Sequence, residues 1–165
     1  MKINQLLQNI AATEFDLTVE GLCLNSHKIQ SGDVFIALQG ENSHGIDCID
    51  QAIERGCIAV LIDSKETVCS VPSIRIDNLS KHLSSLAKTF YSSACDVEII
   101  GITGTNGKTS VAHFISQTLN QLGEKSGLIG TLGIANNSQT SKLTTPDIIT
   151  LYRALDEYHQ KNIKV

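Results

Sequence analysis

The sequence lacks any run of about 20 apolar residues, the length that a membrane-spanning helix needs. Its first residues, MKINQLLQNI, lack the long apolar core and the small-residue cleavage site of a signal peptide. Lysine and arginine form no stripe or cluster, and the formal net charge is -4. These absences argue against a membrane span, a secretory signal and a nucleic-acid-binding surface, which needs cations to displace counterions from phosphates.

Paired cysteines are also lacking. The five cysteines include no C-x-x-C pair, and their number is odd: Cys23, Cys48, Cys57, Cys69 and Cys95. Free thiols in a reducing cytoplasm are therefore favoured over a disulfide or zinc framework. Hydrophobic residues make up 41% and charged residues 18% of the 165 positions, which is enough apolar material for a packed core. The length suits one domain, or a small domain plus part of another.

The first half of the chain is predicted to alternate short strands with helices. Strands are predicted at 21–25, 33–38, 57–62 and 73–76. One helix is predicted at 47–55, ended by Gly56, and a second at 79–90, with Asn78 as its N-cap. The polar stretch that follows predicts a boundary between a domain at 1–95 and another at 96–165.

The second half begins again with a predicted strand at 97–102, followed by a glycine-containing loop and a helix at 111–122 that Gly123 ends. A strand at 126–129, a helix at 147–160 and the opening of a further strand at 163–165 complete the pattern. Strand, loop, helix, strand and helix in this order predict a parallel α/β sheet.

The loop GITGTNGKTS, residues 101–110, resembles a phosphate-binding loop, but its first glycine is displaced. The common pattern G-x-x-x-x-G-K-[ST] places a glycine at position 102, whereas this chain has Gly101. Gly104 and Gly107 would let the backbone approach an anion at the start of the helix. Lys108 would reach the β and γ phosphates, and the Thr109 hydroxyl would bind Mg²⁺. A strand-to-helix turn with a chance lysine is the alternative.

A second segment imitates part of such a site. IAVLID, residues 58–63, resembles the apolar strand and aspartate that hold Mg²⁺ in many phosphate-loop ATPases. It precedes the loop and lies in the other half of the chain. We therefore interpret Asp63 as an exposed residue at the end of a strand.

TGTNGKT, residues 103–109, resembles the ATP loop of the Mur ligase family, whose glycine spacing it shares. Folylpolyglutamate synthetases have a similar loop. LNSHKIQSGDVFIALQGENSHG, residues 24–45, resembles the UDP-binding N-terminal domain of the muramyl ligases, which folylpolyglutamate synthetases lack. GTLG at 130–133 and TTPD at 144–147 are similar to the MurE type, which adds the third peptide residue.

The resemblance implies an α/β chain: a small UDP-binding N-terminal domain, then the start of a phosphate-loop ATPase domain with a parallel sheet. It implies ATP and Mg²⁺ as cofactors, with Lys108 as the catalytic residue and Thr109 as the metal ligand. The implied ATP-binding residues are Gly104, Thr105, Asn106, Gly107, Lys108, Thr109 and Ser110. The implied substrate-binding residues are Leu24, Ser26, Glu41, Asn42, Ser43, Thr144 and Thr145.

The sequence departs from the family pattern at several of these places. His27 stands where arginine is common, and Leu143 stands where some members have asparagine. The segment at 41–43 differs from the His-Gln-Ala of some members, which implies backbone rather than side-chain contacts there. A turn or cap role stays open for Ser26, for Asn42 and for the two threonines.

The implied activity is an ATP-dependent, cytoplasmic ligation in peptidoglycan precursor synthesis. A diamino acid is joined to UDP-N-acetylmuramoyl-L-alanyl-D-glutamate through an acyl phosphate of the substrate carboxylate. Full ligases have three domains, so the resemblance implies a truncated or shortened chain that is inactive by itself. Two alternatives stay open: a non-catalytic module that binds the UDP-muramyl substrate or a nucleotide, and an unrelated phosphate-loop kinase or GTPase.

Overall fold

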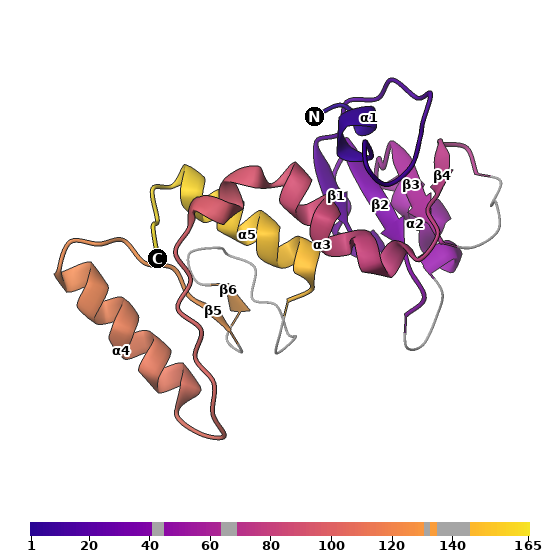
Figure 1. Cartoon of the computed structure of the whole chain (residues 1–165). Coiled ribbons are helices and arrows are strands. Elements are labelled where there is room, and N and C mark those ends of the chain that lie inside the picture. Colours follow the sequence, from indigo (N-terminus) through magenta and orange to yellow (C-terminus); the bar gives the residue numbers. More distant parts are fainter. Residues whose placement is uncertain (41–44, 64–68, 131–132, 135–145) are drawn as a thin grey trace. The chain divides into compact units, whose positions relative to one another are not determined.

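A computed structural model describes residues 1–40, 45–63, 69–130, 133–134 and 146–165 of the chain (Figure 1). The chain divides into two compact units, Met1–Phe90 (unit 1) and Tyr91–Val165 (unit 2). The sequence predicts the division after residue 95. The structure places residues 91–95 in unit 2, because the 3₁₀ helix η3 (Ser92–Asp96) packs against helix α5 (Ile148–Gln160).

Unit 1 contains a four-stranded sheet whose strands are all parallel and follow one another in chain order. The strands are β1 (Gly21–Cys23), β2 (Asp33–Ala37), β3 (Ala59–Ile62) and β4 (Ser73–Arg75), drawn side by side in Figure 1. All four predicted strands are thereby confirmed, each with slightly shorter bounds. A short helix that the sequence pattern did not predict, α1 (Ile3–Leu6), precedes them.

The core of unit 1 explains why the apolar runs form strands. Every residue of β2 and β3 is buried, as expected of parallel strands covered on both faces. Phe35 is 1% exposed and packs in one cluster with Val60 and Ile62. Each large side chain buried in this way contributes roughly 1.5–3 kcal/mol to folding.

Two helices of unit 1 match the predicted positions but differ at their ends. The segment predicted at 47–55 begins as the 3₁₀ helix η2 (Gly45–Cys48) and continues as α2 (Ile49–Glu54). Helix α3 (Leu79–Phe90) follows Asn78, which has a φ of 54°. Asn78 directly precedes the helix, as predicted for its N-cap, and its carbonyl accepts a hydrogen bond from the Lys81 N–H at 2.8 Å. Its backbone differs from the extended conformation that is typical of an N-cap. The left-handed backbone there turns the chain into the helix instead.

Unit 2 contains α4 (Lys108–Gln121), α5 and the short antiparallel pair β5 (Ile129–Gly130) and β6 (Gly133–Ile134). Both helices were predicted. Asp147 caps α5, because its Oδ1 accepts a hydrogen bond from the Thr150 N–H at 2.9 Å. In the described part of the chain, no helix is both long and apolar enough to cross a bilayer.

The predicted strand at 97–102 does not form, and the one predicted at 126–129 is reduced to its last residue in β5. Single backbone bonds nevertheless align these segments with the end of the chain. The Glu98 N–H donates to the Lys164 carbonyl at 2.8 Å, and the Gly127 N–H donates to the Val165 carbonyl at 2.8 Å. Residues 164–165 thus lie between the two segments. These backbone hydrogen bonds are not consecutive enough to form a β-ladder. The segment at 97–102 therefore has the apolar pattern of a strand without forming one.

The apolar residues that recur at helical spacing along α4 are mostly exposed. Phe114 is 66% exposed and Val111 is 45% exposed, and no residue of the helix is buried. Helix α4 is attached near its end by a polar cluster, in which the Asn120 Nδ2 donates to the Ser126 Oγ at 3.0 Å. The side chain of Ser116 lies 2.7 Å from the same hydroxyl. The 3.6-residue period therefore predicted the helix correctly but not the burial of its apolar face.

Cys57 of unit 1 and Cys95 of unit 2 differ in burial, because Cys57 is buried and Cys95 is exposed. Burial, and to a smaller degree the neighbouring Cys69, raise the pKa of the Cys57 thiol from its ordinary 9.0 to about 11. Cys57 is 4% exposed and begins the buried run that becomes β3. It is therefore a packed, neutral thiol at physiological pH.

We expect Cys57 to react with iodoacetamide at pH 8 at least ~100-fold more slowly than Cys95, because only the thiolate is nucleophilic. Between about pH 9 and 11 the unfolded chain loses this proton while the folded chain keeps it, so folding stability falls as pH rises, by roughly 1–3 kcal/mol. Peptide mapping of alkylated protein and urea denaturation across this pH range measure both effects. A Cys57→Ala chain with the same alkaline loss would contradict the assignment.

Candidate functional site

The loop before α4 has the backbone that an anion-binding loop requires. Gly107 has a φ of 79° and is the N-cap of α4, and Gly104 has a φ of 144°. The first helical N–H bonded to the loop is that of Val111, which donates to the Gly107 carbonyl at 2.9 Å. In an α-helix the preceding N–H groups point out of the helix start, where the helix dipole is positive. The loop therefore presents donors and partial positive charge at its mouth.

Lys108 is folded back onto this loop. Its Nζ donates to the Gly104 carbonyl at 2.5 Å and lies 3.4 Å from the Thr105 carbonyl. The side chain is exposed, so both contacts are open to exchange with solvent. The ammonium group is held at the mouth of the loop, where phosphate oxygens can replace the carbonyls as its partners.

The displaced glycine of the loop has no conformational requirement. Gly101 has no left-handed φ, and a Cβ added there would meet open space. A Cβ on Gly107 would also meet no atom within 4 Å, but its φ of 79° strains any residue with a side chain. Gly107 is thus required by the backbone, whereas Gly101 is not.

We therefore expect Gly107→Ala to weaken ATP binding and Gly101→Ala to leave it unchanged. Alanine in the left-handed region costs roughly 1–2 kcal/mol, which distorts the loop or destabilises it. Isothermal titration calorimetry with ATP and Mg²⁺ measures the affinity, and thermal unfolding measures the stability. Equal losses in the two variants would contradict this reading of the loop.

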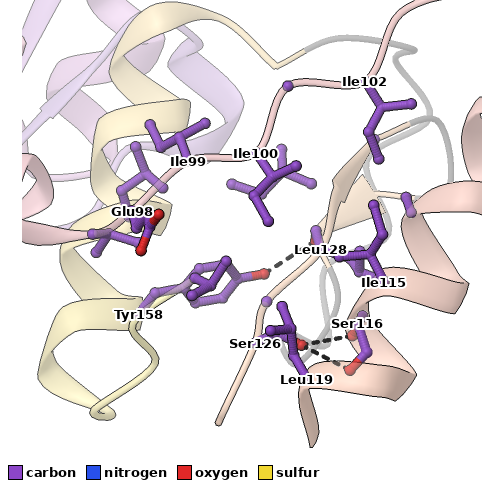
Figure 2. Close-up of a pocket in the computed structure, with 18 of the residues that line it drawn as sticks. Glu98, Ile99, Ile100, Ile102, Ile115, Ser116, Leu119, Ser126, Leu128 and Tyr158 are labelled. Carbon is purple, nitrogen blue, oxygen red and sulfur yellow. Dashed lines mark hydrogen bonds between the residues drawn. The ribbon is translucent and has the colours of Figure 1, made fainter.

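A cavity of about 540 Å³ opens beside the loop within unit 2 (Figure 2). Apolar side chains from three segments face it, including Ile100, Ile102, Ile115 and Leu119. Lys108 and Thr109 line one part of it. Tyr158 closes another side, and its hydroxyl donates to the Leu128 carbonyl at 3.1 Å. Because the lining is mainly apolar, the cavity does not suit a polyphosphate group, whose charges would be costly to desolvate there.

In unit 1, Leu24 and Ser26 directly follow β1, at the carboxyl edge of the parallel sheet. This edge is where ligands bind in open α/β sheets. Ser26 begins the 3₁₀ helix η1 (Ser26–Lys28), and Asn25 caps it by accepting from the His27 N–H at 2.9 Å. The Ser26 hydroxyl donates to Gln51 Oε1 at 2.6 Å. The sequence pattern gave no signal for this Gln51 contact, because its two residues are distant in the chain.

The remaining predicted substrate residues lie outside the described part of the chain: Glu41, Asn42, Ser43, Thr144 and Thr145. Leu143 lies outside it too. Asp63 follows the last residue of β3 in unit 1, which confirms its predicted place at the end of a strand, but it is half-buried and not exposed as predicted. Across the described ranges, no group of three or more His, Cys, Asp and Glu side chains is arranged to hold a metal ion.

Comparison with known proteins assigns both halves of the chain to related domains. Residues 18–91 match the Mur ligase family, catalytic domain, and residues 102–165 match the Mur ligase middle domain. Two curated relatives, from Bradyrhizobium diazoefficiens and Coxiella burnetii, are named UDP-N-acetylmuramoyl-L-alanyl-D-glutamate–2,6-diaminopimelate ligase. They are 38% and 40% identical over 99% and 98% of this chain. The chain spans about a third of their length, 34% and 35%.

Solved structures agree with this assignment at the level of the fold. A structure of a ligase with the same name has a TM-score of 0.72 at 21% identity, over 99% of this chain and 34% of that one. The MurF ligase from Thermotoga maritima in complex with ADP has a TM-score of 0.55 at 25% identity, over 84% of this chain and 29% of that one. The two domain matches, in this order and across most of the sequence, show that this chain belongs to the Mur ligase family.

Proposed function

We propose that the two units form the substrate-binding and ATP-binding parts of a ligase of peptidoglycan precursor synthesis, acting in the cytoplasm. The ligase adds a diamino acid to UDP-N-acetylmuramoyl-L-alanyl-D-glutamate, the substrate that the names of the relatives give. The observation that carries the proposal is the loop at the start of α4, where a left-handed Gly107 and the Lys108 ammonium are brought together.

ATP fits the residues of unit 2. It would supply the γ-phosphoryl group that activates the substrate carboxylate. Gly104 to Ser110 hold the phosphates through backbone N–H groups, and the start of the 14-residue α4 adds its partial positive charge. Lys108 would exchange its contact with the Gly104 carbonyl for contacts with phosphate oxygens. Its positive charge would offset the negative charge of the phosphoryl group that is transferred.

Mg²⁺ also fits the donor set, with a limited contribution from the protein. Thr109 follows the loop lysine and lies in the first turn of α4, where its hydroxyl can join the phosphate oxygens as a ligand. Mg²⁺ keeps several water ligands and commonly takes few from the protein. We therefore propose Thr109 as a metal ligand.

Unit 1 holds the UDP part of the muramyl substrate in this proposal. Leu24 and Ser26 take the uridine part at the carboxyl edge of the sheet. The segment at 41–43 follows β2, whose carboxyl end lies at the same edge, and is proposed to contact the nucleotide-sugar. Thr144 and Thr145, which precede the cap of α5, are proposed to bind the muramyl peptide through their hydroxyl groups.

The test is calorimetry on the 165-residue chain with two ligands, ATP plus Mg²⁺ and UDP-N-acetylmuramoyl-L-alanyl-D-glutamate. We expect one equivalent of each to bind. Prior addition of one ligand should not block the other, because the residues proposed for the uridine part lie in unit 1 and those proposed for ATP lie in unit 2. Failure of both to bind would overturn the proposal. Binding of the muramyl ligand alone, with no nucleotide affinity, would instead favour a non-catalytic binding module.

A further inference from the structure

The loop that follows β1 is held in place from both sides. The Asn25 side chain caps η1 through the His27 N–H, and the Gln30 N–H donates to Asp33 Oδ2 at 3.0 Å. Asp33 is 3% exposed, so the second of these bonds is sheltered from water. The backbone of the loop is therefore fixed in the unliganded chain. What remains to be fixed is the direction of the Ser26 hydroxyl, since a hydroxyl proton rotates to suit its partner.

Gln51 fixes that direction from another element. It lies in the first turn of α2, the helix that leads from β2 to β3, and α2 packs against η1. The Ser26 Oγ donates to its Oε1 at 2.6 Å, across 25 positions of sequence. Ser26 is 5% exposed, whereas Gln51 is half-buried. This bond is thus a sheltered link between the loop and the helix at the carboxyl edge of the sheet.

We propose that Gln51 is a positioning residue of the nucleotide-sugar site in unit 1. Gln51 accepts the hydrogen bond that the Ser26 hydroxyl donates, so only the lone pairs of the Ser26 oxygen remain for a ligand. Ser26 therefore accepts hydrogen bonds from the ligand and donates none. The matching ligand group is a donor on the uridine part, either an N–H of the base or an O–H of the ribose. This inference rests on the proposed function of unit 1.

The test uses UDP as the ligand and the full chain carrying Lys108→Ala, which removes the lysine of the phosphate loop from the measurement. In this parent we expect Gln51→Leu to weaken UDP binding about 5- to 10-fold, the typical effect of one hydrogen bond. Ser26→Ala should weaken it to a similar degree. The double variant should bind no more weakly than Ser26→Ala alone, because Gln51 acts through Ser26.

Two further variants separate positioning from general damage to the fold. Gln51→Glu keeps the acceptor oxygen and should keep UDP affinity within about threefold of the parent in 0.3 M salt, where its charge is screened. Glu54→Ala, an exposed change on the same helix, should leave affinity unchanged. Thermal unfolding of every variant shows whether it is folded. If Gln51→Leu is not folded, Gln51→Met takes its place in the experiment.

Three outcomes would overturn the inference: unchanged UDP affinity in Gln51→Leu, additive losses in the double variant, or a Gln51→Glu chain as weak as Gln51→Leu. Additive losses would mean that Gln51 acts independently of Ser26. A weak Gln51→Glu chain would mean that the amide donates to Ser26 and not the reverse. Absence of UDP binding in the parent would contradict the proposed function itself, which the other three outcomes leave standing.

Discussion

Lys108→Ala is expected to lower the affinity of the chain for ATP roughly 10- to 100-fold, the effect of removing charge-assisted hydrogen bonds to phosphate. In the unliganded chain the lysine ammonium is held by the carbonyls of Gly104 and Thr105, at 2.5 and 3.4 Å. Phosphate oxygens replace these neutral partners with charged ones, and alanine offers neither charge nor donor. Isothermal titration calorimetry at fixed salt and Mg²⁺ measures the difference.

AMP is the matched control ligand for this variant, because it lacks the β and γ phosphates that Lys108 is proposed to reach. Its affinity should change little between the parent and Lys108→Ala chains. Lys125→Ala is the matched control protein, since it removes an exposed lysine of the same unit. Equal ATP affinity in the parent and Lys108→Ala chains would refute the phosphate-loop assignment. An equal loss of ATP affinity in Lys125→Ala would mean that the loss comes from the change in net charge and not from the position of Lys108.

Gly127→Ala is expected to destabilise unit 2 by roughly 2–4 kcal/mol, through overpacking and loss of a buried hydrogen bond. A Cβ on Gly127 would lie 2.1 Å from Cε2 and 2.6 Å from Cδ2 of the Tyr158 ring. Tyr158 is 3% exposed, and its hydroxyl donates to the Leu128 carbonyl at 3.1 Å. Moving the ring away from an added Cβ would therefore break this hydrogen bond.

The loss should be local, because Tyr158 belongs to α5 and the two units are separate. Hydrogen exchange of α5 amides should accelerate while that of β2 amides stays the same. Gly130→Ala is the control in the same segment, since a Cβ there meets no atom within 4 Å and its φ is not left-handed. Similar exchange rates in the two alanine variants would contradict the packing of Tyr158 on Gly127.

In unit 1 the sequence pattern predicted the strands well because burial there is local and continuous. The run around Val60 is apolar at every position and the structure buries all of β3. The left-handed Gly56, with a φ of 95°, ends the preceding helix as its position predicted. The left-handed φ of Asn78 was not predictable, because residue type does not reveal φ, and asparagine serves equally in caps and in left-handed turns.

In unit 2 the helices were predictable and the strands were not. Helix α4 and helix α5 follow from a 3.6-residue period that each segment carries by itself. A strand needs a partner, and residues 97–102 are joined to the end of the chain by a single backbone bond at Glu98. Two apolar residues of this segment, Ile99 at 67% exposed and Ile100 at 48% exposed, consequently remain in contact with water.

The sequence by itself determined the family-specific loop, its lysine and threonine, and the alternation of strands and helices, because these depend on residue types at short spacing. Only the tertiary structure decided which glycine of the loop is required, since that depends on the left-handed backbone of Gly107 and not on the motif. It also brought Gln51 to Ser26 and Tyr158 to Gly127, two contacts between distant segments. Contacts of this kind arise from packing, which leaves no periodic trace in the order of the residues.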